Sequence, residues 1–168
     1  MADYTPQPIE FADTAPFWVE GSAVAEATPE QVWLVLIDYP SWPSWFGGGV
    51  TSVRSTSDPS TGVGSTREVI LGPGRRVRFD ERFIAWEEGE RWAFTGVTGP
   101  GVVSSLVERC VIEATSPMHT RVTYRMAFEP KPAIKPLLPL ARPAVRRALT
   151  RAMTGLAKEA QARPHRSM

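Results

Sequence analysis

The feature that most constrains the fold is a series of six strand-like segments, joined by short turns and followed by one long amphipathic helix. The segments alternate apolar and polar residues and are rich in β-branched and aromatic side chains, as half-buried strands are. Because short turns join antiparallel neighbours, the segments should form an antiparallel meander. The six predicted strands cover residues 50–56, 65–71, 76–86, 91–98, 102–114 and 120–130.

A further strand and a helix are predicted before this meander. Residues 17–27 alternate in the manner of a strand. The segment TPEQVWLVLID then begins with a helix start signal, because Thr28 suits the N-cap, Pro29 suits the first turn, and Gln31 completes a capping box. Pro40 ends this helix, since the residue before a proline is pushed towards extended geometry.

The stretch DYPSWPSWFGGGV, residues 38–50, combines bulky aromatic residues with three consecutive glycines. A turn alone does not need two tryptophans. SWPSWF can form one short helical turn, and Gly47–Gly49 would then release the chain into the next strand. A lid or shoulder over a hollow space would explain the aromatic residues.

The C-terminal part of the chain predicts a long helix over about residues 136–160, with Pro139 and Pro143 in its first turns or at a kink. A helix with one apolar stripe must bury it, and the concave face of a twisted antiparallel sheet is available. The space left between helix and sheet is a natural ligand pocket. The stripe comprises Leu138, Ala141, Val145, Ala148, Ala152, Leu156 and Ala160.

Composition supports one ordinary globular domain of 168 residues, with 42% hydrophobic and 22% charged residues. The net charge of +1 gives no general attraction to nucleic acid. Cys110 is the single cysteine, which fits a reducing compartment, and we expect a cytoplasmic protein without a signal peptide or a membrane-spanning segment. We expect a loose arm over residues 1–15, one domain over 16–162 and a tail over 163–168.

Three motifs carry a resemblance to a known family. They are ATPEQVWLVLIDYPSWPSW (27–45), GSTREVILGPGRRVRFDERFIAWEEGERWAFTG (64–96) and TRVTYRMAFEP (120–130). They resemble the polyketide cyclase/dehydrase branch of the SRPBCC, or START-like, superfamily. The resemblance implies an α+β helix-grip fold, in which a seven-stranded curved antiparallel sheet surrounds a long C-terminal helix. It also implies two short helices after the first strand and an internal cavity. The superfamily includes cyclases, lipid carriers and hormone receptors and shares no catalytic triad.

Strand parity places four polar residues on the faces that also carry apolar side chains. Glu81, for example, shares a face with Phe79 and Phe83, although Ile84 and Trp86 break the alternation of that strand. The inward polar residues are either structural, as an ion pair and core groups, or catalytic. In the catalytic hypothesis an arginine stabilises an enolate or carboxylate while a carboxylate acts as general base. The four candidates are Arg67, Glu81, Glu108 and Tyr124.

The curled sheet and the long helix together predict an elongated apolar cavity between them. The resemblance implies that the two short helices support the long helix at one end of this cavity. Trp42, Trp45 and Phe46 would then wall the cavity or its mouth, or else fill the core between the short helices and the long one. The ligand-binding candidates of the cavity are Trp42, Trp45, Phe46, Phe79, Phe83, Trp92, Phe94, Met126, Phe128, Leu138, Val145 and Leu149.

Other motifs give no support for metal or cofactor chemistry. His119 and His165 are isolated from each other and from Cys110, so we expect no metal site. The glycine-rich segments lack the surroundings of a phosphate-binding loop, no Gly-x-Ser-x-Gly elbow is present, and we expect no cofactor. Residues 131–168 carry nine basic residues and one acid. This excess indicates a solvated face of the helix or a weak contact with an anionic membrane surface.

Three classes of function remain open. The first is binding or transport of a hydrophobic small molecule, such as a lipid, polyketide or isoprenoid, in the internal cavity. The second is a polyketide cyclase or aromatase that uses the inward acid–base residues. The third is a protein-assembly or stress factor. The sequence leaves open whether the chain is an enzyme and whether it is a monomer or a homodimer.

Overall fold

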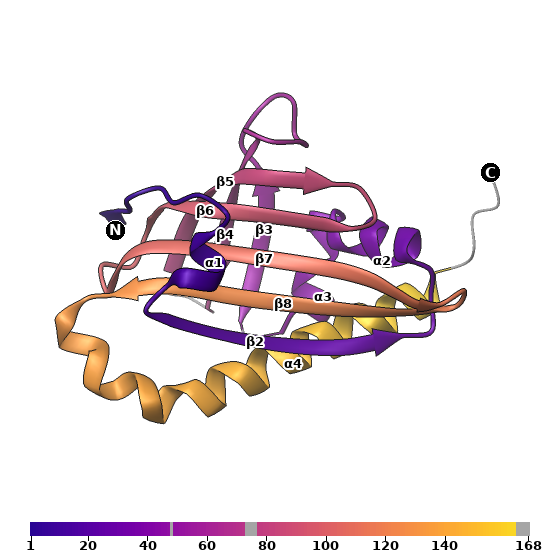
Figure 1. Cartoon of the computed structure of the whole chain (residues 1–168). Coiled ribbons are helices and arrows are strands. Elements are labelled where there is room, and N and C mark those ends of the chain that lie inside the picture. Colours follow the sequence, from indigo (N-terminus) through magenta and orange to yellow (C-terminus); the bar gives the residue numbers. More distant parts are fainter. Residues whose placement is uncertain (48, 73–76, 164–168) are drawn as a thin grey trace.

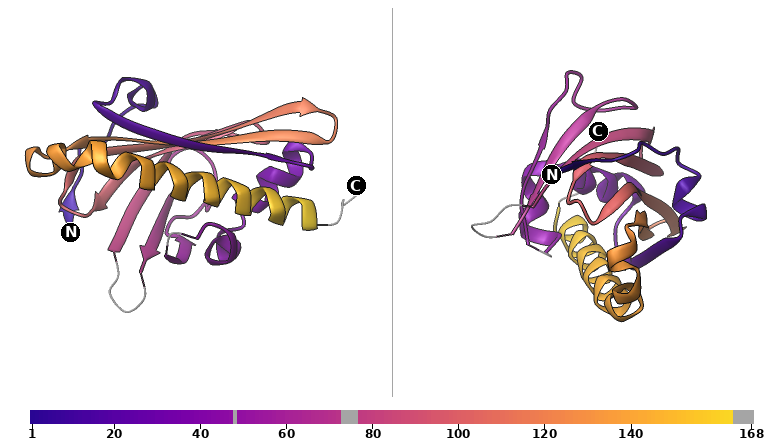
Figure 2. Two further views of the ribbon diagram at one scale, coloured as in Figure 1. Left: turned by 90° about the horizontal axis from the view of Figure 1, so that it is seen from below. Right: turned by 90° about the vertical axis from the view of Figure 1, so that its left-hand side faces the viewer.

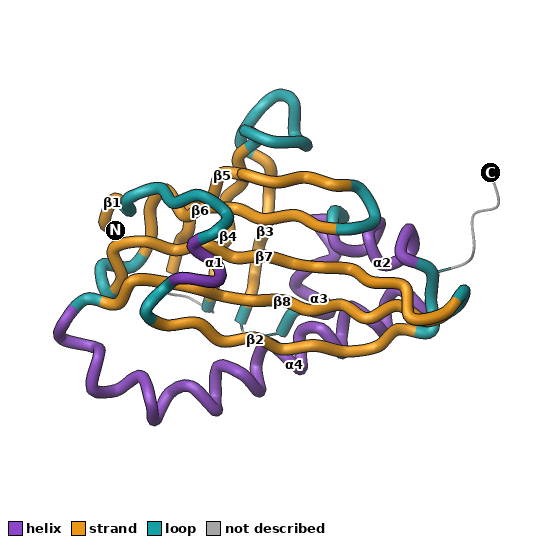
Figure 3. The backbone as a smooth tube through the Cα atoms, viewed as in Figure 1, coloured by secondary structure: helices purple, strands orange, loops and turns teal. Residues whose placement is uncertain are grey.

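The computed structural model describes residues 1–47, 49–72 and 77–163, and its centre is a curled antiparallel sheet (Figures 1 and 3). Neighbouring strands follow the order β2-β8-β7-β6-β5-β4-β3, so β2 and β3 lie at the two edges. The strands are β2 (Phe17–Ala25), β3 (Val50–Ser55), β4 (Thr66–Leu71), β5 (Val77–Glu87), β6 (Arg91–Gly99), β7 (Val103–Ser116) and β8 (His119–Pro130).

The longest helix crosses the open, concave side of this sheet (Figure 2). The C-terminal half of that helix, α4, is buried against β2 and α2, whereas its N-terminal half is largely exposed. The helices are α1 (Phe11–Thr14), α2 (Pro29–Leu36), η1 (Tyr39–Ser41), α3 (Trp42–Trp45), η2 (Pro132–Leu137) and α4 (Leu138–Ala162). None of the helices in the described part of the chain combines the length and the apolar character needed to span a bilayer.

Two glycines allow α4 to approach its neighbours closely. A Cβ on Gly21 of β2 would lie 2.3 Å from the backbone nitrogen of Thr150, and a Cβ on Gly155 would lie 2.1 Å from the carbonyl oxygen of Trp45. Both distances are shorter than any van der Waals contact. The helix is therefore held against the sheet on one side and against α3 on the other.

The predicted α+β helix-grip fold is confirmed, with its seven-stranded curved sheet, its C-terminal helix and its short helices after the first strand. The capping box of Thr28 and Gln31 is present, and Pro139 lies in the first turn of α4 while Pro143 lies inside it. Parts of four predicted features lie outside the described residues. These are Gly48 of the glycine run, the connection at 73–74, the start of the strand predicted at 76, and tail residues 164–168.

The N-terminal arm differs from the loose segment that we expected. The pairing of β6 with β7 ends at Thr95 and Val107. Beyond this point the last residues of β6 pair instead with β1 (Ala2–Asp3). The backbone amide of Tyr4 donates to β6, and that of Thr5 donates to β7. The arm then crosses the convex face, where α1 packs on β7 and β8 (Figure 1). Residues 2–5 therefore fill a gap between two strands of the sheet.

The side chain of Tyr4 anchors this arm. It is 5% exposed, and its hydroxyl donates a hydrogen bond of 2.8 Å to the carbonyl oxygen of Pro100. A Cβ on Gly96 would lie 2.6 Å from the Tyr4 ring, so the ring occupies the space that a side chain of β6 would otherwise fill. The ring packs in a small apolar cluster with Val103, Leu106 and Phe128.

The first prediction concerns this anchor. Tyr4→Ala should lower the free energy of unfolding by about 3 kcal/mol, because a buried ring is lost and a cavity is left. Tyr4→Phe keeps the ring and loses one hydrogen bond, so it should cost about 1 kcal/mol. Urea denaturation of the three proteins measures both values. Unchanged stability in Tyr4→Ala would mean that the arm does not hold the sheet together.

Candidate functional site

A cavity of about 210 Å³ lies between the concave face of the sheet, α3 and α4. Four polar residues contribute to its lining, namely Arg67, Glu81, Glu108 and Tyr124. The apolar part of the lining consists of Trp42, Phe46, Val50, Val69, Leu71, Phe79, Met126, Val145, Ala148 and Leu149.

The polar and apolar parts of the lining differ in depth. All four polar residues are buried, and each is at most 8% exposed. In contrast, Ala148 is exposed and Phe46, Leu71 and Val145 are half-buried. The cavity thus has a buried polar floor and an apolar mouth next to α4. A molecule that enters it meets apolar side chains first and charged groups last.

Arg67 and Glu81 form an ion pair on the floor. They lie directly opposite each other on β4 and β5, and Arg67 Nε donates to Glu81 Oε2 over 2.6 Å. Burial, the largest single effect, lowers the pKa of Arg67, but Glu81, Tyr39 and Tyr124 together raise it above the usual value. Burial raises the pKa of Glu81, and the Arg67 guanidinium opposes that rise. The predicted inward pair is therefore present.

Aromatic rings surround the guanidinium of Arg67. Its central carbon lies between 4.6 and 5.4 Å from five ring centroids, within the range of a cation–π interaction. Among the described residues, neither Arg67 Nη1 nor Tyr39 Oη has a hydrogen-bond partner. The floor thus holds a cation that is shielded from water. The five rings belong to Tyr39, Trp42, Phe83, Trp92 and Phe94.

Glu108 and Tyr124 supply a second polar pair from β7 and β8. The hydroxyl of Tyr124 lies within hydrogen-bonding distance of Glu108 Oε2. Burial, with the nearby charge of Glu81, raises the pKa of Glu108 to about 8, although the bond with Tyr124 acts in the opposite direction. Burial also raises the pKa of Tyr124. Both shifts favour the protonated carboxyl and phenol on the floor, beside the charged guanidinium of Arg67.

This arrangement suits a ligand oxygen. The single proton of Tyr124 is directed at Glu108 Oε2, so the protonated carboxyl of Glu108 supplies the free hydrogen-bond donor, and a guanidinium stabilises negative charge that forms on a carbonyl or phenol oxygen. A carboxyl with a pKa near the working pH can also transfer a proton in either direction. Among the described residues, no group of three or more His, Cys, Asp or Glu side chains is placed to hold a metal ion.

Only half of the predicted ligand-binding residues line the cavity. Six of the twelve do so: Trp42, Phe46, Phe79, Met126, Val145 and Leu149. Trp45, Phe83, Trp92 and Phe94 are buried in the main core, where three of them lie against Arg67. Phe128 and Leu138 instead join the cluster around Tyr4.

Four lining residues were missing from the prediction, namely Val50, Val69, Leu71 and Ala148. Val69 and Leu71 lie on the same face of β4 as Arg67, so the parity argument could have included them. Ala148 lies in the middle of the predicted apolar stripe and Val50 at the start of a predicted strand, but nothing local to either residue indicates a cavity.

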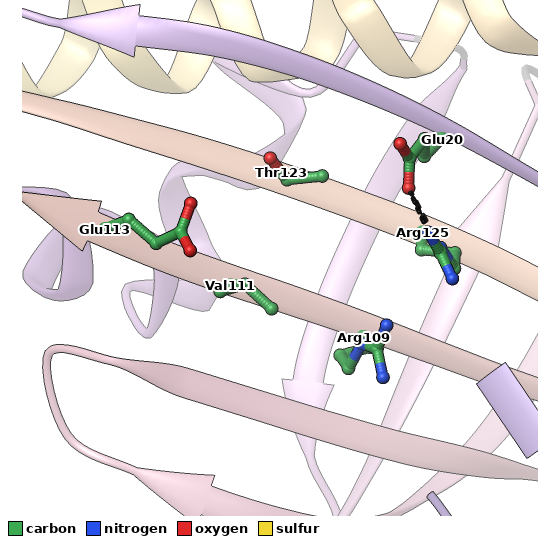
Figure 4. A pocket seen from close by; sticks show the side chains of 6 residues that line it. All are labelled: Glu20, Arg109, Val111, Glu113, Thr123 and Arg125. Carbon is green, nitrogen blue, oxygen red and sulfur yellow. Dashed lines mark hydrogen bonds and ion pairs between the residues drawn. The ribbon is translucent and has the colours of Figure 1, made fainter. Parts of the chain in front are cut away.

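A second, shallower depression lies on the convex face of the sheet (Figure 4). It lies over β2, β7 and β8, and three of its four charged groups form ion pairs. Arg125 contacts Glu20 over 2.7 Å, and Arg109 contacts Asp13 of α1 over the same distance. These bonds tie the N-terminal arm and the edge strand to the centre of the sheet. The depression is lined by Glu20, Arg109, Val111, Glu113, Thr123 and Arg125.

Comparison with protein families matches residues 17–161 to a family described as "Polyketide cyclase / dehydrase and lipid transport". An uncharacterized protein of Mycobacterium tuberculosis is 33% identical over 156 residues, which cover 92% of this chain and 91% of the relative.

Solved structures show the same fold at low sequence identity. A protein from Thermus thermophilus superimposes with a TM-score of 0.71 at 19% identity, covering 87% of this chain and 98% of that one. The Zhui aromatase/cyclase of Streptomyces sp. R1128 superimposes with a TM-score of 0.68 at 18% identity, covering 86% and 93%.

The second prediction concerns the buried ion pair. Arg67→Ala leaves the carboxyl of Glu81 buried without its partner, so stability should fall by about 3–5 kcal/mol. Combining Arg67→Met with Glu81→Leu replaces both charges by apolar groups and should restore most of that loss. Arg91→Ala breaks an exposed pair with Glu87 and should cost about 1 kcal/mol or less. A double variant no more stable than Arg67→Ala would contradict this account.

The third prediction concerns pH. Between the ordinary pKa of 4.5 and the folded value of about 8, Glu108 keeps its proton in the folded state but loses it on unfolding. Raising the pH through this window therefore favours unfolding, by at most about 1.4 kcal/mol per pH unit, and the loss levels off above pH 8.

Glu108→Gln cannot titrate, so its stability relative to the wild type should rise steadily between pH 5 and pH 8. Urea unfolding at several pH values measures this difference. Glu113→Gln, an exposed change on the same strand, serves as the control and should follow the wild type. Parallel curves for the wild type and Glu108→Gln would show that Glu108 is ionised in the folded protein.

Proposed function

The chain belongs to the polyketide cyclase/dehydrase and lipid transport family, and from this premise we propose that it binds an apolar small molecule carrying one oxygen-containing polar end. The observation that carries the proposal is the gradient of the cavity, from an apolar mouth to a buried polar floor. The polar end of the ligand meets Arg67, Glu108 and Tyr124. Its apolar body lies against Phe79, Met126 and neighbouring side chains of the wall.

The size of the cavity limits what it encloses. Its volume of about 210 Å³ is below the ~300–1,000 Å³ of typical small-molecule sites. A ligand of one or two rings fits inside. A longer lipid, polyketide or isoprenoid would place its polar end on the floor and leave its remaining length at the open mouth beside Ala148.

The polar floor selects the chemistry of that end. A ligand without a polar atom would leave buried hydrogen-bonding groups without partners, which is costly in a dry site. A ketone, phenol or carboxylic acid provides the matching oxygen. This pattern favours oxygenated apolar molecules over pure hydrocarbons.

A second candidate function is catalysis of the cyclase or aromatase type. It is supported by Glu108, whose pKa of about 8 suits proton transfer near neutral pH, and by its position beside Arg67 in the same cavity. In this reaction Arg67 stabilises the enolate oxygen of a poly-β-ketone while Glu108 moves the proton. Conversion of a poly-β-ketone by the wild type, with loss of turnover in Glu108→Gln, tests it. If the wild type bound the poly-β-ketone without converting it, catalysis would be rejected and ligand binding would remain the proposed function.

A role as an assembly or stress factor has no feature of the described residues in its favour. The cytoplasmic location and the choice between monomer and homodimer stay predictions.

The fourth prediction tests the cavity with a matched pair of ligands. 2-Naphthol should bind in the micromolar range, about −8 kcal/mol, and naphthalene, which lacks the hydroxyl, at least tenfold more weakly, ~1.4 kcal/mol. Fluorescence titration measures both affinities. Equal affinities for the two ligands would show that the polar floor does not contribute to binding.

Two substitutions on α4 locate the binding site. Ala148 lies at the mouth, and Ala144 is exposed one turn earlier and outside the lining. Ala148→Trp should block the mouth and weaken 2-naphthol binding at least tenfold, whereas Ala144→Trp should leave it unchanged. Equal binding by the two variants would place the ligand elsewhere.

A further inference from the structure

The segment from Lys131 to Arg151, which forms η2 and the first half of α4, has an unusual charge. It contains six basic residues and no acidic residue. Because the whole chain carries a net charge of +1, the remainder of the chain carries −5. The positive charge of this protein is therefore concentrated on one short stretch, which we call the η2–α4 surface.

Large apolar side chains are exposed on the same surface. Leu140 is 81% exposed and Leu137 is 59% exposed. The sheet covers this half of the helix only in part, and the first buried residue of α4 is Leu149. Leu140 in particular gains little from the fold of the chain itself.

The basic side chains around these leucines are largely free to meet another partner. Within the described residues, Arg146, Arg147 and Arg151 form no ion pair, and all three are exposed. Lys135 reaches Glu129 only at 3.6 Å on the surface. Arg142 differs, because its guanidinium lies over the rings of Phe17 and Trp18.

The η2–α4 surface also borders the cavity. Val145, Ala148 and Leu149 line the cavity from the first half of α4, and Ala148 is exposed at its mouth. Whatever covers the exposed leucines therefore also lies next to the entrance.

We propose that the η2–α4 surface docks on an anionic lipid bilayer. Leu137 and Leu140 enter the boundary between headgroups and acyl chains, and the arginines and lysines contact the acidic headgroups, as in amphipathic helices that lie in a membrane interface. The cavity mouth then faces the bilayer, and an apolar ligand moves between lipid and cavity with little exposure to water. This last step rests on the proposed ligand-binding function, whereas docking itself does not.

Sedimentation with sucrose-loaded vesicles tests the proposal. The wild type should bind vesicles of 70% phosphatidylcholine and 30% phosphatidylserine at least tenfold more tightly than vesicles of phosphatidylcholine alone. Binding should weaken in 0.5 M NaCl, because salt screens surface charges. Failure to bind the anionic vesicles, or equal binding to both kinds, would overturn the proposal.

Two variants separate the apolar and charged contributions. Leu137→Ser combined with Leu140→Ser, and Arg146→Gln combined with Arg147→Gln and Arg151→Gln, should each reduce binding to the anionic vesicles at least fivefold. The matched controls are Val63→Ser with Met118→Ser, two exposed apolar residues on other loops, and Arg121→Gln on the sheet. The controls should bind like the wild type. If the controls lost as much vesicle binding as the two variants, binding would not depend on the η2–α4 surface, and the proposal would be overturned.

Titration with 2-naphthol on the same variants keeps the two proposals apart. None of the changed residues lines the cavity, so each variant should retain wild-type affinity for 2-naphthol, which also shows that it is folded. Vesicle binding by a wild type that does not bind 2-naphthol would reject the proposed function and leave docking supported. The reverse result would reject docking alone.

Discussion

The interior of this protein depends on how it accommodates the charge of Arg67. A guanidinium that is 1% exposed costs several kcal/mol to desolvate unless it is paired, and here Glu81 lies directly opposite it on the next strand. Aromatic rings from β5, β6, η1 and α3 lie around the cation, which still reaches the cavity. Trp42 and Trp45, which precede the glycine run, therefore both pack in the core, and only Trp42 also lines the cavity.

The same arrangement explains why the concave side of the sheet is not filled completely. Of the five rings that gather around Arg67, only that of Trp42 also lines the space under the first half of α4, where smaller side chains such as Val69 and Ala148 form part of the wall. Glu108 is held in this low-dielectric space next to Glu81, which is why its proton is retained. The helix itself is divided, since its second half closes the core and its first half borders an opening.

Much of this could be predicted from the sequence because strands repeat every two residues. That period placed Arg67, Glu81, Glu108 and Tyr124 on one face, and the structure brings all four together. Parity cannot tell a core residue from a cavity residue, so Phe83 and Phe94 were expected in the wall but pack on Arg67. At Trp86 the period fails because a register shift between Phe83 and Ala85 leaves one extra residue on β5, which turns Trp86 towards the core. No local sequence pattern predicts the burial of Tyr4, because that burial depends on a gap between two strands that lie some ninety residues further along the chain.

A crystal structure of the protein with 2-naphthol bound is the most direct test of the central claim, that an apolar cavity with a polar floor receives an oxygenated ligand. The account predicts one naphthol in the cavity. Its oxygen should lie within ~3.2 Å of a polar atom of Arg67, Glu108 or Tyr124, with its rings between Phe79 and α4. A naphthol bound with its oxygen towards the mouth, or bound only on the outer surface while the cavity stays closed, would contradict it.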